Sequence, residues 1–249
     1  MALTDKLYDL LKRKTATTAF IAQIDGLRFL AIWLVVMDHL HGFIRTKIPF
    51  AYTTPQTYYW PVYQFFDAQG LKGVLLFFMI SGFILGMPFA RYFWHEGREV
   101  NLKNYFLRRL TRLEPPYIIN ILFCFFVLLV YKGHDFASSF PRTFSGLLPN
   151  LLSSLFYLHY TLFPGTFSVN PVTWSLEIEV QFYLLVPLLV LVFKLPKLYR
   201  RWLLVLAILL LPLLQQKFSL PVNAAIKPAN NIFNYLQYFL LGLARIFVL

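Results

Sequence analysis

An arginine and a histidine stand inside the first long apolar run of the sequence. The run 22–44 contains Arg28 and, eleven residues later, His39. On an α-helix this separation returns to within roughly 20° of the same face, about 16 Å further along the axis. Ionisable residues are costly in a membrane-spanning helix and mark functional sites there by default. His39 is therefore a candidate general base, with Arg28 on the same stripe.

Two aspartates belong to the same run, and a plainer interpretation of it stays open. Asp25 lies three residues before Arg28, and Asp38 points about 100° away from His39, from where it can orient a neighbouring group. In the plainer interpretation, Arg28 extends to the inner membrane interface, and His39 and His41 simply approach the outer one. The presence of Arg28 and His39 on one face favours the functional interpretation.

Two glutamates enter another apolar run. Glu177 and Glu179 lie near the start of the run 174–193. Carboxylates that enter an apolar helix are costly unless a cationic or protic group meets them. A contact with His39 would satisfy both partners, and the carboxylate would hold the imidazole in one tautomer. The alternative, in which both glutamates are solvated at the membrane interface, suits one of them better than two.

The composition assigns these runs to a membrane protein. Of the 249 residues, 58% are hydrophobic and 14% are charged, whereas charged residues make up about a quarter of soluble chains. A membrane span needs about 20 mostly apolar residues. Six runs approach this requirement: 22–44, 71–90, 117–133, 174–193, 201–216 and 231–249. We therefore expect an all-α, polytopic transmembrane helix bundle of six to seven spans, forming one membrane-embedded domain over 1–249.

The basic residues orient the spans, since cytoplasmic loops are enriched in Lys and Arg. A seventh apolar stretch, 146–163, decides the arrangement. It is interrupted by Pro149, Asn150, Ser153, Ser154 and His159. If it crosses the membrane, the basic cluster after the run 174–193 falls outside; if it is re-entrant or interfacial, that cluster is cytoplasmic.

The second arrangement, which we prefer, places the N-terminus in the cytoplasm. Fifteen basic residues are then inside: Lys6, Lys12, Arg13, Lys14, Arg91, Arg98, Lys103, Arg108, Arg109, Arg112, Lys194, Lys197, Arg200, Arg201 and Arg245. Seven are outside: Arg45, Lys47, Lys72, Lys132, Arg142, Lys217 and Lys227.

Several other kinds of site are not supported. The net charge of +12 could indicate nucleic-acid binding, but the basic residues fall in short clusters between apolar runs, so no nucleic acid is expected as a partner. Cys124 is the only cysteine, and the five histidines are scattered without a metal-binding spacing. No Gly-x-Ser-x-Gly motif is present. We expect neither a metal site nor a hydrolase nucleophile.

Four sequence blocks in one order resemble the signature of the acyltransferase-3 family of integral membrane acyltransferases. They are DGLR at 25–28 followed by ten residues and His39, FFMISGFIL at 77–85, RRLTRLEPPY at 108–117 and WSLEIEVQFY at 174–183. Each block alone would be a weak signal, and their order makes the signal strong.

The resemblance implies the transfer of an acyl group, commonly acetyl, from cytoplasmic acyl-CoA to a hydroxyl of a carbohydrate-type acceptor. The acceptor is a glycan, a glycolipid or a small glycoside, and acyl-CoA is a co-substrate rather than a bound cofactor. In this scheme His39 is the catalytic base, Arg28 is its partner and Glu179 takes the acidic position of the last block. We expect a multi-pass protein of the bacterial inner membrane.

Arg108, Arg109 and Arg112 match the inner basic motif of the family, in a loop that leads into the third span. Guanidinium groups bind phosphate through two parallel hydrogen bonds, which suits the phosphates of coenzyme A. The alternative is that these arginines only fix the topology. Ser81 either lines the site or, as we prefer, donates to a carbonyl of its own helix. The residues expected to line the site are Asp25, Asp38, Ser81, Trp174, Ser175, Glu177 and Tyr183.

Two other functions stay open. Arg28, His39 and the glutamates would also suit a transporter or channel with a proton or anion path. The resemblance implies about ten spans, whereas six are expected here and the sequence stops at Leu249 inside an apolar run. We therefore also consider a homologue that is incomplete at its C-terminus and inactive.

Overall fold

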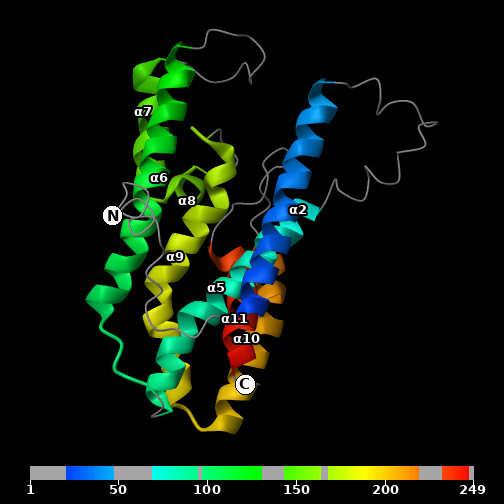
Figure 1. The fold of residues 1–249 in the computed structure, drawn as a ribbon, viewed down its shortest axis with the longest axis vertical. Coiled ribbons are helices and arrows are strands. Elements are labelled where there is room, and N and C mark those ends of the chain that lie inside the picture. Colours follow the sequence, from blue (N-terminus) through cyan, green and yellow to red (C-terminus); the bar gives the residue numbers. More distant parts are fainter. Residues whose placement is uncertain are drawn as a thin grey trace, which may run out of the picture.

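The computed structural model describes residues 21–47, 69–94, 97–130, 143–163, 168–218 and 232–246. In these residues every regular element is a helix (Figure 1). The α-helices are α2 Ala22–Lys47, α5 Gln69–Phe93, α6 Leu102–Val130, α7 Phe144–Leu155, α8 His159–Leu162, α9 Trp174–Leu189, α10 Lys197–Phe218 and α11 Ile232–Arg245. Two 3-10 helices, η1 Pro171–Thr173 and η2 Val190–Lys194, flank α9. The expected all-α helix bundle is confirmed for this part of the chain.

Five helical stretches are long and apolar enough to cross a membrane. They are Ala22–Ile44, Gln69–Phe93, Leu102–Val130, Pro171–Lys194 and Lys197–Gln215. The third stretch begins well before residue 117, where its apolar run was expected to start. The Asn101 side chain caps α6 by accepting from the N–H of Asn104 over 3.0 Å, and Pro115 and Pro116 lie inside the helix. The basic motif is therefore helical, and its expected place in a loop is wrong.

The sixth expected span, 231–249, is helical over α11, and residues 231 and 247–249 lie outside the described residues. The 14 residues of α11 extend about 21 Å, less than the roughly 30 Å of a bilayer core. It is not one of the five candidate spans. Over its described residues α11 packs against α5, and its side chains Phe239 and Leu243 are completely buried.

The stretch 146–163 is divided between two helices. The 12 residues of α7 extend only about 18 Å, and α8 follows after a short turn. In that turn Tyr157 has a φ of 57°, a left-handed conformation that does not continue a helix. In Figure 1, α7 lies beside the end of α6, and α9 begins again in the same half of the molecule. The chain therefore turns back within this stretch, and neither of its helices is among the candidate spans. We call it the re-entrant segment, and its place in the membrane stays a prediction.

Helix α5 is central and packs between α2 and α11. Glycines make both approaches close. A Cβ at Gly73 would lie 2.6 Å from the carbonyl oxygen of Ala31 in α2. On the other side, a Cβ at Gly82 would collide with the carbonyl oxygen of Phe239, and one at Gly242 would collide with that of Met79. Small residues allow membrane helices to approach this closely, and here they align α2 and α11 along α5.

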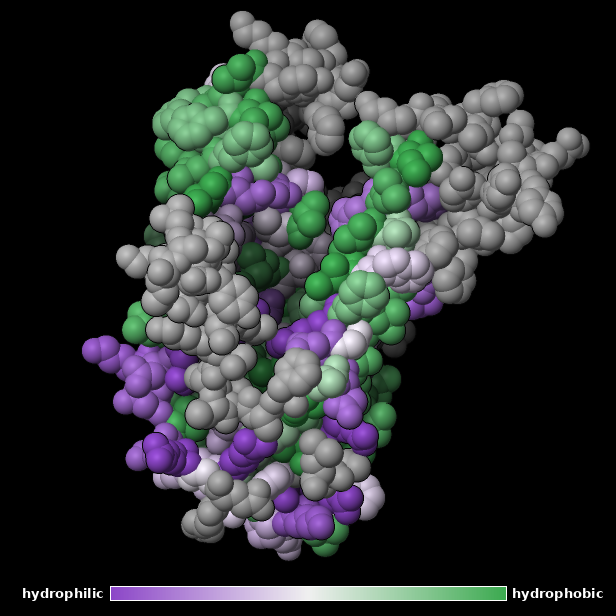
Figure 2. Space-filling view, in the orientation of Figure 1, coloured by the Kyte–Doolittle hydropathy of each residue, from purple (hydrophilic) through white to green (hydrophobic). Residues whose placement is uncertain are grey.

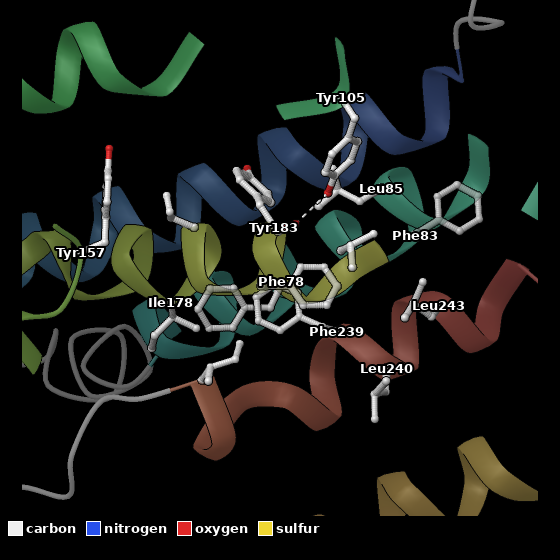
Figure 3. Close-up of a cluster of buried hydrophobic side chains, with 14 of the residues drawn as sticks. Phe78, Phe83, Leu85, Tyr105, Tyr157, Ile178, Tyr183, Phe239, Leu240 and Leu243 are labelled. Atoms are coloured by element: carbon white, nitrogen blue, oxygen red, sulfur yellow. Dashed lines mark hydrogen bonds between the residues drawn. The ribbon is translucent and has the colours of Figure 1, made fainter. Parts of the chain in front are cut away.

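Aromatic rings join α9 to α5 and α11 (Figure 3). Phe239 of α11 stacks on Phe182 of α9 with 3.9 Å between ring centroids, and on Phe78 of α5 with 4.6 Å. All three rings are buried. Phe182 and Phe78 each lie one turn from a polar residue, Glu179 and Ser81 respectively, so the stack positions these two side chains.

The chain direction alternates from α2 through α5, α6, α9, α10 and α11 (Figure 1). Hydrophilic residues gather at the lower end of the molecule, where α5 connects to α6 and η2 connects to α10 (Figure 2). This is the end that the basic residues assign to the cytoplasm, and the orientation stays a prediction. The following basic residues lie outside the described residues: Lys6, Lys12, Arg13, Lys14, Lys132, Arg142 and Lys227.

Candidate active site

Glu179 lies on α9 and receives two hydroxyl donors. The Ser81 hydroxyl of α5 donates to Glu179 Oε1 over 2.9 Å. The Tyr183 hydroxyl, one turn further along α9, donates to the same oxygen. The preferred role of Ser81, donation to a carbonyl of its own helix, is therefore wrong. A carboxyl group on the neighbouring helix is the stronger acceptor and takes the hydroxyl.

A further hydrogen bond connects α6, which carries the basic motif, to the backbone of Tyr183 on α9. The Tyr105 hydroxyl of α6 donates to the carbonyl oxygen of Tyr183 over 3.3 Å (Figure 3). One turn along α6, the guanidinium carbon of Arg109 lies 6.0 Å from the centre of the Tyr105 ring, at the limit of a cation–π contact. Arg108 and Arg112 are exposed. The basic motif and the glutamate thus belong to one connected set of contacts.

His39 lies on α2 with its side chain exposed. Its Nδ1 is 2.7 Å from the carbonyl oxygen of Val35, one turn earlier. A carbonyl oxygen only accepts, so in the neutral imidazole this hydrogen bond assigns the proton to Nδ1 and leaves a lone pair on Nε2. The backbone therefore holds the ring in the tautomer in which Nε2 can accept a proton.

Arg28 and Asp25 of α2 pair with each other, and Asp38 lies at a helix contact. Arg28 Nη1 lies 3.0 Å from Asp25 Oδ1, in an ion pair that is partly exposed. The Asp38 carboxyl group lies against Gly70, at the contact between α2 and α5. Because α2 is one continuous helix, Arg28 stays about 16 Å from His39 along its axis. The structure places both on one helix without bringing them into contact.

The expected contact between His39 and a glutamate is not formed among the described residues. His39 is hydrogen-bonded to its own helix, and Glu179 is hydrogen-bonded to Ser81 and Tyr183. Helices α2 and α9 each pack against α5, and a hollow lies between α2 and the side of the molecule formed by α6 and α8 (Figure 2). The backbone rather than a carboxylate therefore holds the imidazole.

Glu177 lies on another face of α9 and is completely buried. Its Oε2 accepts from the backbone N–H of Tyr160 in α8 over 3.3 Å. Four residues later, Gln181 Nε2 donates to the carbonyl oxygen of Tyr157 over 3.0 Å and to the Thr161 hydroxyl over 3.4 Å. Gln181 is not among the expected site residues, although its spacing of four from Glu177 places both on one helix face.

Trp174 and Ser175 begin α9, and both are partly buried. The centroid of the Trp174 ring lies 5.3 Å from that of Tyr235 and 6.4 Å from that of Phe78. Trp174 therefore contributes to the aromatic packing that joins α5, α9 and α11. Throughout the described ranges, no three or more His, Cys, Asp or Glu side chains form a group that could hold a metal ion.

Comparison with known proteins gives a family and several relatives. The family model described as Acyltransferase domain matches residues 21–244. Peptidoglycan O-acetyltransferase OatA of Listeria monocytogenes serovar 1/2a is 28% identical over 194 residues, which cover 74% of this chain and 26% of the relative. Nodulation protein 10 of Rhizobium leguminosarum bv. viciae is 26% identical over 186 residues, 72% of this chain and 45% of the relative. O-acetyltransferase OatA of Staphylococcus aureus (strain NCTC 8325 / PS 47) is 24% identical over 187 residues, 71% of this chain and 26% of the relative.

The matched region spans about a quarter of the length of the two O-acetyltransferases and less than half of Nodulation protein 10. No solved structure matches the chain. The family match includes all four sequence blocks, from Asp25 to Tyr183. The candidate active site therefore lies inside the region that the family shares.

Proposed function

Because this chain belongs to the acyltransferase-3 family, we propose that it transfers an acyl group, in the simplest case acetyl, from acyl-CoA to a hydroxyl of a carbohydrate acceptor. The observation that carries the proposal is the state of His39. Its Nδ1 is engaged by the Val35 carbonyl, which leaves Nε2 as a proton acceptor on an exposed side chain. Such a nitrogen can serve as the general base for acyl transfer to a hydroxyl. The names of two relatives, both O-acetyltransferases and one of peptidoglycan, support an acetyl group and a glycan acceptor.

In the proposed reaction, His39 Nε2 removes the proton of the acceptor hydroxyl while the hydroxyl oxygen attacks the thioester carbonyl of acyl-CoA. The new C–O bond forms and the C–S bond breaks. The CoA thiolate then takes the proton from the imidazolium, so the products are an O-acyl acceptor and free CoA. A route through an acyl intermediate on the protein would use the same base.

In this scheme Glu179 acts on the imidazolium that forms on His39, and the α6 arginines act on the phosphates of acyl-CoA. The Glu179 carboxyl group is fixed by Ser81 and Tyr183 and does not touch His39, so in this scheme it would favour the imidazolium through the electrostatic field of the site rather than by contact. The arginines of the basic motif, 108–112, would bind the phosphates of acyl-CoA at the inner side of the membrane. The acyl group would then have to reach from that side into the bundle.

The test compares the acylation of envelope glycans and small glycosides by mass spectrometry. The cells carry the intact gene, a deletion or His39→Ala, and we expect acylation only with the intact gene. Gly42→Ala is the matched control on the same helix, because a Cβ at Gly42 meets nothing within 4 Å. Equal acylation in all strains would refute the proposed acyltransferase activity. An ion flux that disappears in His39→Ala while acylation persists would support a transporter instead.

A further inference from the structure

Two faces of α9 carry different polar pairs. Glu179 and Tyr183 face α5, where Ser81 meets them. Glu177 and Gln181 lie on the face that contacts the segment joining α7 to α8. Glu177 and Glu179 are two residues apart, which is about 200° around a helix. The two pairs therefore point in nearly opposite directions from one rigid helix.

The pair Glu177 and Gln181 binds both ends of the turn between α7 and α8. Glu177 Oε2 accepts from the N–H of Tyr160 over 3.3 Å, and Gln181 Nε2 donates to the carbonyl oxygen of Tyr157 over 3.0 Å. The N–H of Tyr160 belongs to the first turn of α8, where an N–H has no partner within its own helix. The two side chains thus satisfy one backbone donor and one backbone acceptor of an irregular segment.

The turn itself needs this support. Tyr157 has a φ of 57°, which a bulky residue adopts only where its surroundings hold it. Its ring stacks on Tyr117 of α6 with 4.6 Å between centroids, and the Tyr117 hydroxyl donates to the carbonyl oxygen of Ser154 over 2.7 Å. Ser153 Oγ and His159 Nδ1 lie 3.2 Å apart across the turn. Helices α6 and α9 therefore fix the turn from two sides.

Glu177 does not reach a substrate in this arrangement. Its side chain is completely buried, and one carboxyl oxygen is occupied by the α8 backbone. The other oxygen has no hydrogen-bond partner among the described residues. A buried carboxyl group with part of its hydrogen-bonding capacity unused is costly, so its presence calls for a function other than packing.

We propose that Glu177 and Gln181 are positioning residues, which fix the rotation of α9 against the re-entrant segment and thereby direct Glu179 toward Ser81. Any rotation of α9 that released the turn would carry Glu179 away from α5 by the same angle. The catalytic consequence of this arrangement rests on the proposed function, whereas the structural contact does not.

Hydrogen exchange tests the contact without any measurement of activity. The full chain in lipid nanodiscs is compared with Glu177→Gln, which keeps an oxygen acceptor, and with Glu177→Met and Gln181→Met, which keep the length without the polar group. We expect residues 156–163 to exchange at least about tenfold faster in the two Met variants and at the normal rate in Glu177→Gln. Glu179→Gln, on the opposite face, is the matched control and should leave this segment unchanged. Normal exchange in both Met variants would overturn the proposal.

Kinetics then test the consequence for Glu179. Glu177→Gln should keep kcat, while Glu177→Met and Gln181→Met should lower it about tenfold with little change in the KM for acyl-CoA. If Glu177→Gln were as inactive as Glu177→Met, the carboxylate would have a chemical role and the positioning role would be overturned. If one Met variant fails to fold, the other decides. An intact chain without activity would refute the proposed function, and hydrogen exchange would still decide whether the contact exists.

Discussion

At the scale of single residues, one carboxyl oxygen receives two hydroxyl groups. Ser81 and Tyr183 both donate to Glu179 Oε1, so either donor can partly replace the other. We expect Ser81→Ala and Tyr183→Phe each to lower kcat less than about tenfold. The double variant should lose more than the product of the two effects, because it leaves the oxygen without a donor.

Rates of acyl transfer for the intact chain, the two single variants and the double variant measure this coupling. Tyr92→Phe is the control, since Tyr92 is an exposed tyrosine of the same α5 helix. Single effects that simply multiply in the double variant would contradict the shared oxygen.

The arginines of α6 are accessible to an anionic ligand, and this too is a property of single side chains. Arg108 and Arg112 are exposed and Arg109 is partly exposed. Replacement of all three by glutamine should weaken acetyl-CoA binding at least about tenfold, because charge-assisted hydrogen bonds to phosphate are among the stronger ones. Equilibrium binding to the purified chain measures the loss. The double variant Arg91→Gln and Arg98→Gln is the control at the same end of the molecule. If the affinity for acetyl-CoA survives the triple replacement, the motif has only a topological role.

At the scale of helices, the apolar runs predict which segments are helical but not where they end or what they touch. The third apolar run was expected to start at residue 117, yet α6 extends back through Pro115 and Pro116 to a cap at Asn101. Arg28 and His39 could be related by spacing because they share one helix. The bond between Ser81 and Glu179 joins residues 98 apart in the sequence, and neither spacing nor hydropathy indicates which helices become neighbours. The contact expected between His39 and a glutamate failed for the same reason.

The glycines between α5 and α11 make a prediction about helix packing. Gly82→Ala and Gly242→Ala would each place a methyl group against a backbone carbonyl oxygen of the facing helix, and backbone cannot move aside as a flexible side chain can. We expect each to lower the free energy of unfolding by about 1–3 kcal/mol. Gly42→Ala in α2 meets nothing within 4 Å and should be neutral or stabilising by up to about 1 kcal/mol. Thermal unfolding in detergent compares the three, and equal melting temperatures would contradict the close approach.

At the scale of the whole molecule, α5 connects the two parts of the candidate active site. It packs against α2, which carries His39, and against α9, which carries Glu179. The separation of the base from the carboxyl group is therefore set by how α2 and α9 are placed around α5. Variants that alter this placement should change acyl transfer even when neither residue is touched.

The re-entrant segment makes a prediction about the two sides of the membrane. Thr143 and Val172 flank it and should lie on the outer side, whereas Arg98 and Lys197 should lie in the cytoplasm, where basic residues are enriched. All four side chains are exposed. In a Cys124→Ser background, a cysteine placed at each position is treated with a membrane-impermeant maleimide. We expect labelling at 143 and 172 in intact cells, and at all four positions after permeabilisation.

The side of the membrane on which position 172 lies decides between the two arrangements, because it depends, as does the side of Lys197, on whether 146–163 crosses. Labelling at 143 without labelling at 172 in intact cells would mean that the stretch spans the membrane. The basic cluster 194–201 would then lie outside, against the enrichment of Lys and Arg in the cytoplasm. In that case α9 would run in the opposite direction, and Glu179 would approach from the inner side while His39 stays nearer the outer one. Labelling at both 143 and 172 in intact cells would place Glu179 and His39 in the same half of the bilayer, as acyl transfer at one site requires.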